Sequence, residues 1–125
     1  MTTTISGSNG IVFPDATSMQ TGQQAVKAWV NFNGTGVVAI RAGYNVASIT
    51  DNGTGNYTVN FTTAMTDVNY SFTFGGKITS GSGVSKGIIG QWLADPTTSA
   101  LQIASFADNF AAFADNGIVN VTISR

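Results

Sequence analysis

The sequence predicts an all-β protein, an antiparallel β-sandwich or jelly-roll-like head with a short extended N-terminal assembly segment. Apolar and polar residues alternate with a period of two through most of the chain, which is typical of strands that bury one face. Asn-Gly pairs and glycine-rich pieces separate these runs at the short spacing of an antiparallel fold. All 6 acidic residues are Asp, and the absence of Glu argues against a helix-rich protein.

Residues 1–22 stand apart from the head domain, which we expect to span residues 23–125. Asp15 is the only charged side chain of this segment, and its candidate strands are TTTIS and GIVF. Only GSNG separates the two strands, so we expect no obvious pairing between them, and an isolated two-stranded ribbon is marginal in water. The segment must therefore dock on its own domain, on sister chains or on another protein. The residues predicted to line this interface are Ile5, Ile11, Val12 and Phe13.

Four segments of the head show the clearest alternation. The predicted core faces are Val26, Ala28, Val30 and Phe32 in the first segment, Tyr57, Val59 and Phe61 in the second, Tyr70, Phe72 and Phe74 in the third, and Val119, Val121 and Ile123 in the last. Thr and Asn fill most of the alternating positions, as expected of the solvated face of an antiparallel sheet. Trp29 lies opposite the apolar face of its segment, so we expect it to cover a second core or an interface in preference to a ligand site.

The tetrapeptide NGTG occurs twice, at residues 33–36 and 52–55. Asn-Gly supplies the positive φ angles that tight hairpin turns require. We therefore expect the first copy to join AVKAWVNF to VVAIRAG and the second to join NVASITD to NYTVNFTT. With the other breaks, about eight short strands are expected in the head.

The repeat F-A-D-N begins at Phe106 and again at Phe113. Together with Phe110 these aromatic residues have helical spacing, so a short helix is one interpretation and an alanine-rich loop is the other. Asp108 and Asp115 of the repeat are a conceivable carboxylate pair and, with their Asn neighbours, a conceivable calcium site. Asp-Asn pairs more often form Asx turns, and no Asp-x-Asp-x-Asp-Gly loop is present, so we predict no catalytic, cofactor or metal site.

Composition excludes several classes of function. The chain has 125 residues and neither Cys nor His, which excludes disulfides, Cys/His zinc sites, Cys nucleophiles and imidazole bases, and we predict that it is not an enzyme. A net charge of −1 with 5 scattered Lys and Arg gives no basic surface for nucleic acid. Neither a secretory signal nor a run of about 20 apolar residues is present. We therefore expect the protein to be made in the cytoplasm and not to insert into a membrane.

Charged residues make up only 9% of the chain, against about 25% in an average soluble domain. A monomer usually keeps itself soluble with charge. A chain that does without it either presents a heavily hydroxylated surface or hides much of its surface in an assembly, and we expect both.

Three pieces of the chain are specific enough to compare with a known family. They are KAWVNFNGTG at residues 27–36, YNVASITDNGTGNYTVNFT at residues 44–62 and the closing VNVTI at residues 119–123, and GIVFPDATSMQT precedes them. The first two lie in a block, residues 27–72, that resembles the family as a whole, and with this block the pieces cover about half of the chain. They resemble a module found at the ends of bacteriophage tail fibres and related virion proteins.

The resemblance implies a virion structural protein, made in the cytoplasm of the bacterial host and usually a homotrimer. It implies an N-terminal part tied to other virion proteins and a β-rich head that touches the host surface, commonly its polysaccharide. A long shaft usually precedes such modules, whereas about 26 residues do so here. A short tail fibre, a fibre tip, a capsid or baseplate decoration (cement) protein and a stand-alone carbohydrate-binding module therefore stay open. The resemblance implies no catalytic or ligand residues, because its motif consists of turns and strands.

Residues 81–116 have no counterpart in that module and are the natural place for a recognition surface. Trp92 is a candidate for stacking on a sugar ring. The candidates for hydrogen bonds to a glycan are Asp95, Asp108 and Asn109.

Overall fold

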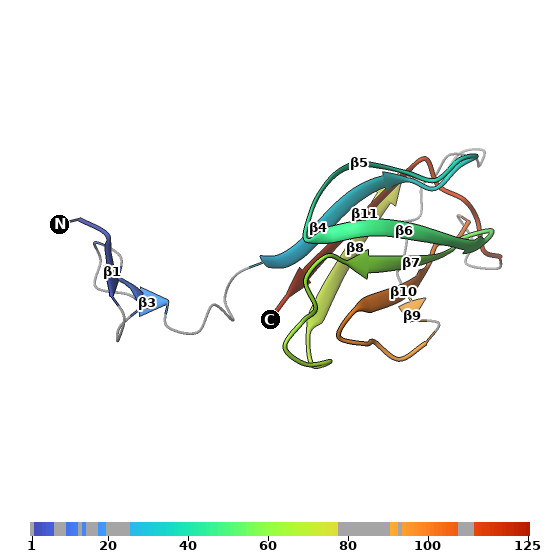
Figure 1. The fold of residues 1–125 in the computed structure, drawn as a ribbon. Coiled ribbons are helices and arrows are strands. Elements are labelled where there is room, and N and C mark those ends of the chain that lie inside the picture. The colour runs from blue at the N-terminus through green and yellow to red at the C-terminus, as the bar shows by residue number, and fades with distance from the viewer. Residues whose placement is uncertain are drawn as a thin grey trace.

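Eleven strands, and no helix, lie within the residues that the computed structural model describes. These are residues 2–6, 10–12, 14, 18–19, 26–77, 91–92, 94–107 and 112–125. Two antiparallel four-stranded sheets pack face to face as a sandwich, which confirms the predicted all-β class (Figure 1). The two sheets together hold eight strands, and a separate three-stranded sheet lies in the N-terminal segment.

The two sheets of the sandwich are named sheet I and sheet II. Sheet I consists, in spatial order, of β5 (Ala39–Tyr44), β4 (Val26–Asn33), β11 (Ile118–Ser124) and β8 (Ser71–Lys77). Sheet II consists of β6 (Val46–Gly53), β7 (Asn56–Phe61), β10 (Ala100–Ala104) and β9 (Gln91–Trp92). β4 begins and β11 ends at one end of the sandwich, the entry end, and the β4–β5 and β6–β7 connections lie at the other, the hairpin end (Figure 1).

Alternate side chains of both sheets point between them and form the core. Its fully buried members are Ala28, Val30, Phe32, Tyr57, Val59, Leu101, Ile103, Val119, Val121 and Ile123. The predicted core faces are thus confirmed except at Val26, which is exposed at the start of β4. Phe72 and Phe74 are half-buried against this core. Edge-to-face aromatic contacts join the sheets, for example Phe32 and Tyr57 with ring centroids 5.2 Å apart. Burying each large side chain contributes about 1.5–3 kcal/mol.

Both predicted hairpins are present, β4–β5 and β6–β7. The expectation that the Asn-Gly pair supplies the positive φ is wrong for the first turn, where Gly36 takes φ 61° and Gly34 does not. In the second turn Gly53 and Gly55 both take positive φ, at 122° and 63°. Asn33 instead braces the first turn, because its side-chain amide donates to the Thr35 carbonyl at 2.7 Å.

The outer face of sheet II is an array of amides and hydroxyls. Asn60 donates to the Thr50 hydroxyl at 2.9 Å, and Asn52 donates to the Thr58 hydroxyl at 2.8 Å. Gln102 on β10 donates to the Asn56 side chain at 2.9 Å. These polar groups solvate the face without charge, which accounts for part of the low charged fraction of the chain.

The two F-A-D-N copies meet as β-structure. Phe106 and Phe113 form an antiparallel bridge, their ring centroids lie 5.1 Å apart, and Ala107 N–H donates to Ala112 O at 3.0 Å. A helix would separate residues seven positions apart by about 10 Å along its axis. The helical interpretation is therefore wrong for the described residues of this segment, and Phe110 lies outside them.

The N-terminal segment contains β1 (Thr4–Ser6), β2 (Gly10–Val12) and β3 (Ser18–Met19). β1 and β2 pair antiparallel with Ile5 opposite Ile11, a pairing that the sequence did not make obvious. β2 also pairs with β3. The sheet is very small, and Ile5 is 84% exposed.

Candidate functional site

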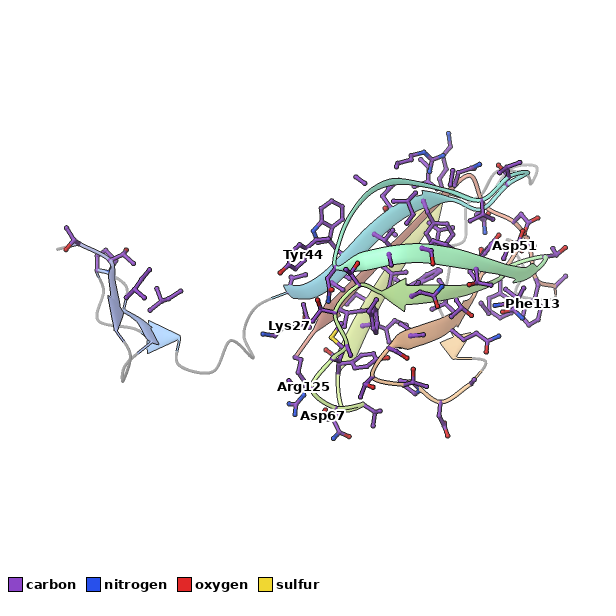
Figure 2. The ribbon with its side chains drawn as sticks, in the orientation of Figure 1. Lys27, Tyr44, Asp51, Asp67, Phe113 and Arg125 are labelled. Carbon is purple, nitrogen blue, oxygen red and sulfur yellow. The ribbon has the colours of Figure 1, made fainter. Side chains whose placement is uncertain are left out.

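A groove of about 470 Å³ lies at the entry end, between the corner of the two sheets and the segment that follows β7. Figure 2 labels Lys27, Tyr44, Asp67 and Arg125 at this end of the sandwich. The groove is lined by Lys27, Tyr44, Asn45, Thr62, Thr63, Ala64, Met65, Thr66 and Arg125.

Asn45 builds the corner where the chain leaves sheet I for sheet II. Its backbone takes φ 54°, a left-handed conformation that Asn tolerates better than most residues. The side-chain amide donates to the carbonyls of Lys27 at 3.1 Å and Thr63 at 3.0 Å. Its side-chain oxygen accepts the N–H of Thr63 at 2.7 Å. Asn45 therefore holds the first residues of β4 against the segment after β7.

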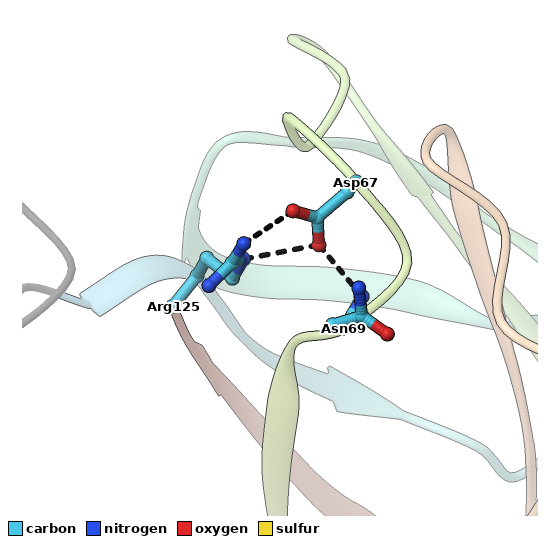
Figure 3. Close-up of polar contacts among 3 residues, drawn as sticks. All are labelled: Asp67, Asn69 and Arg125. Atoms are coloured by element: carbon cyan, nitrogen blue, oxygen red, sulfur yellow. Dashed lines mark hydrogen bonds and ion pairs between the residues drawn. The ribbon is translucent and has the colours of Figure 1, made fainter.

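Arg125 and Asp67 form the opposite wall as a two-pronged ion pair (Figure 3). Asp67 also accepts the backbone N–H of Asn69 at 2.8 Å. The Arg125 guanidinium and, after it, the Asn69 N–H hold the pKa of the Asp67 carboxyl below its usual value. The same pair raises the pKa of Arg125, so both groups stay charged. The ion pair fixes the residue after β11 to the loop before β8.

Hydroxyl groups, one ammonium and one aromatic ring make up the exposed chemistry of the groove. Thr62, Thr63 and Thr66 are exposed, whereas Met65 is buried beneath them. The Tyr44 side chain is 59% exposed, and its partner across the strands, Trp29, is 40% exposed on the outer face of sheet I. Trp29 thus covers no second core within the described residues, and the prediction that it covers an interface is untested.

A second polar cluster lies at the hairpin end and is structural. Buried Tyr57 places its hydroxyl 2.8 Å from the Gly34 carbonyl and 2.7 Å from the Asp115 carboxylate. Burial, and next the hydrogen bond to Asp115, raise the pKa of the Tyr57 hydroxyl, so it stays protonated. Buried Asn116 donates to the Ser105 hydroxyl at 2.5 Å. Asp115 and Asn116 are thus used to hold loops together.

The glycan-contact residues predicted from sequence do not form one constellation in the described part of the chain. Trp92 lies on β9 and pairs with Ile103 of β10. The side chain of Trp92 lies outside the described residues. Asp95 is exposed in the loop before β10, whereas the Phe106–Phe113 bridge follows the far end of that strand. Asp108 and Asn109 lie outside the described residues.

Of the predicted interface residues, Ile5 is exposed and Ile11 is half-buried. The Val12 backbone belongs to β2, but its side chain and the whole of Phe13 lie outside the described residues.

The groove was missed by sequence reasoning because its members come from four distant places in the chain. Lys27 lies in an expected strand and Tyr44 only in a piece that resembles fibre modules, and no short motif links either residue to Arg125. The one available signal was the polar run TTAMTD directly after a strand, which carries hydroxyls at an edge of the fold.

No protein-family model, no curated protein and no solved structure matches the chain. The resemblance to fibre modules therefore stays a prediction. In the described ranges, no helix is long and apolar enough to cross a membrane. The same residues contain no group of three or more His, Cys, Asp or Glu side chains that could hold a metal ion.

Proposed function

We propose that the protein is a bacteriophage virion structural protein, a short tail fibre or fibre tip that assembles as a homotrimer. Its N-terminal segment joins the chains to one another and to other virion proteins, and its β-sandwich head contacts the host cell surface, including its polysaccharide. The exposure of Ile5 in the N-terminal sheet carries this proposal.

The N-terminal sheet is too small to hold itself together in water. Its strands have three, three and two residues, and even longer two-stranded ribbons are marginal alone. Ile5 exposes 84% of its surface although it pairs with Ile11, so the sheet buries little on this side. Three copies of the segment, related by a threefold axis, would each cover the Ile5 of a neighbour.

The β4–β5 hairpin offers a second surface for assembly. Besides Tyr44, which lines the groove, four of the eight large apolar side chains that are exposed among the described residues lie on it or on its loop: Val26, Trp29, Val37 and Ile40. β5 is an edge strand, and all six of its residues are exposed. Exposed apolar side chains beside an unpaired edge are typical of a surface that another chain covers.

The two ends of the sandwich suit the two tasks of a fibre head. The chain enters β4 at the entry end, so the hairpin end lies farthest from the point where the N-terminal segment joins the head. Val37 is 87% exposed in the β4–β5 connection, and Phe113 of the F-A-D-N bridge is exposed at the same end of the sandwich (Figure 2). The Tyr57 cluster gives these loops a rigid base.

Light scattering after size exclusion tests the assembly. The full chain is expected at three times its mass of 12.9 kDa. Ile5→Asp should dissociate it, because each chain would then place a charge in an apolar seam worth about 1.5–3 kcal/mol per residue. Thr2→Asp adds the same charge to an exposed position of the same segment and should leave the trimer intact. A wild-type monomer, or an Ile5→Asp trimer that survives dilution, contradicts the proposal.

Immunogold electron microscopy of the virus particle tests where the protein is placed. Labelling of the tail or its tip supports a fibre. Labelling of the capsid facets instead contradicts the fibre and supports a decoration protein.

A further inference from the structure

We propose that the entry-end groove binds an acidic saccharide, a pyranose ligand that carries a carboxylate. In this assignment Lys27 pairs with the carboxylate, Tyr44 stacks on a sugar ring, and the threonine hydroxyls bind sugar hydroxyls. The inference deepens the host-contact part of the proposed function, on which it rests, and adds a second contact at the entry end to the exposed loops of the hairpin end. It does not depend on the trimer.

The charge of the groove selects an anion. Its two cationic side chains are Lys27 and Arg125, and Arg125 is already neutralised by Asp67. Of the other carboxylates in the described residues, Asp51 accepts a backbone N–H of its own turn, and Asp115 is bound by Tyr57 at the hairpin end. Asp95 is exposed in the loop before β10, and no ion pair joins it to Lys27. Lys27 therefore supplies a positive charge with no acidic partner among the described residues.

The remaining lining of the groove matches the two faces of a sugar. Thr62, Thr63 and Thr66 present hydroxyls that both donate and accept hydrogen bonds, as sugar hydroxyls do. The largely exposed Tyr44 ring offers a flat apolar face with a polar tip. A volume of about 470 Å³ lies within the usual range of small-ligand sites.

The walls of the groove are fixed before any ligand arrives. Asn45 joins the start of β4 to Thr63 through three side-chain hydrogen bonds. Arg125 and Asp67 join the end of β11 to the loop before β8. A preformed site loses less conformational entropy on binding, so even a few polar contacts suffice for measurable affinity.

A peptide ligand fits the groove less well. Peptide recognition generally uses an apolar groove for helix anchors, an open strand edge or an aromatic-lined channel. The floor residue Met65 is buried, and four of the nine lining residues, Tyr44 and the three threonines, carry hydroxyls. The chemistry therefore favours a hydroxylated ligand with one anionic group.

Calorimetric titration of the full chain tests the assignment. The probes are a galacturonic acid trisaccharide and the matched neutral galactose trisaccharide. We expect the acidic probe to bind at least about tenfold more tightly, the usual scale of a hydrogen bond to a charged group. Lys27→Gln should remove that preference, and Tyr44→Ser should weaken both probes. Backbone amide NMR should place the largest shifts at Tyr44 and Thr63.

Lys77→Gln is the matched control, because Lys77 is an exposed lysine at the hairpin-end terminus of β8. It should leave both affinities unchanged. The proposal is overturned if the two probes bind with equal affinity, or if Lys77→Gln and Lys27→Gln lose the same amount of affinity for the acidic probe. It is also overturned if inorganic phosphate binds as tightly as the acidic probe.

The mass of the same samples, measured by light scattering, separates this proposal from the trimer. A monomer that binds the acidic probe in the groove contradicts the trimer and supports the site. A trimer that binds neither probe supports the assembly and overturns the site.

Discussion

The phenol oxygen of Tyr57 lies 2.7 Å from a carboxylate oxygen of Asp115, although 58 positions separate the two residues in the chain. The same carboxylate oxygen accepts the N–H of Gly55 at 2.8 Å, and the Tyr57 hydroxyl also reaches the Gly34 carbonyl. One buried tyrosine and one aspartate therefore tie both hairpin connections to the segment that carries the F-A-D-N repeat.

Tyr57→Phe should destabilise the head by about 1–3 kcal/mol, because it leaves the Gly34 carbonyl and the Asp115 carboxylate without their shared donor. The ring and its contact with Phe32 are kept, so the loss measures the hydroxyl alone. Urea unfolding of the wild type and the variant measures the difference in the free energy of unfolding. Tyr44→Phe, which removes an exposed hydroxyl, should change stability by less than about 0.5 kcal/mol. Equal losses in the two variants contradict the role assigned to Tyr57.

Asn45→Ala should cost more stability than Asn45→Gly. Both variants remove the hydrogen bonds to Lys27 and Thr63, worth about 0.5–1.5 kcal/mol each. Only alanine adds the strain of a left-handed backbone, about 1–2 kcal/mol, whereas glycine adopts φ 54° freely. Urea unfolding of the two variants measures the difference. If alanine is tolerated as well as glycine, the corner is not held in the left-handed conformation.

The sandwich itself could be predicted from sequence because its signals are local. A period of two in β4, β7 and β11 identifies the core face without knowledge of the partner strand, and the NGTG pieces mark where two hairpins turn. The sequence predictions were incomplete or wrong where the pairing of two backbone segments decides the structure. β1 pairs with β2 in spite of the weak turn signal of GSNG, and Phe106 meets Phe113 across a bridge although their spacing also fits a helix.

The groove could not be predicted, because its formation depends on register across the sheets. Lys27 and Asn45 are 18 positions apart, and Asp67 and Arg125 are 58 positions apart. Alternation assigns each of these residues to a face of a strand but does not say which ends of which strands coincide. From the sequence alone, residues 62–66 are only a polar connection after a strand. Their part in the groove becomes visible once the end of β7 and the end of β11 are known to lie at the same end of the sandwich.

The Asp67–Arg125 pair should make stability depend on pH in the acidic range. The pKa of Asp67 in the folded state lies below its ordinary value of 3.8, so the pair stabilises the head above that pH. The contribution is lost as the pH falls through the lowered pKa. The stability gap between the wild type and Asp67→Asn, measured by urea unfolding, should therefore narrow from neutral pH to about pH 3.

Arg125→Gln removes the other partner of the same ion pair. Its stability gap to the wild type should also narrow between neutral pH and about pH 3. Because both side chains are partly exposed, added salt should also reduce the gap. A gap that is the same at neutral and acidic pH would show that the pair does not contribute through its charge.

Gly55→Ala should destabilise the head more than Gly36→Ala, although both glycines have nearly the same φ, 63° and 61°. The shared backbone strain is about 1–2 kcal/mol. A Cβ on Gly36 meets nothing within 4 Å, whereas a Cβ on Gly55 would overlap the backbone oxygen of Ser105 and lie 2.7 Å from the backbone nitrogen of Ala114. Overpacking of this kind adds about 1–3 kcal/mol, because the contact is with backbone that cannot rotate away. Urea unfolding of the two variants isolates the packing cost, and equal losses would mean that the F-A-D-N segment does not rest on the β6–β7 turn.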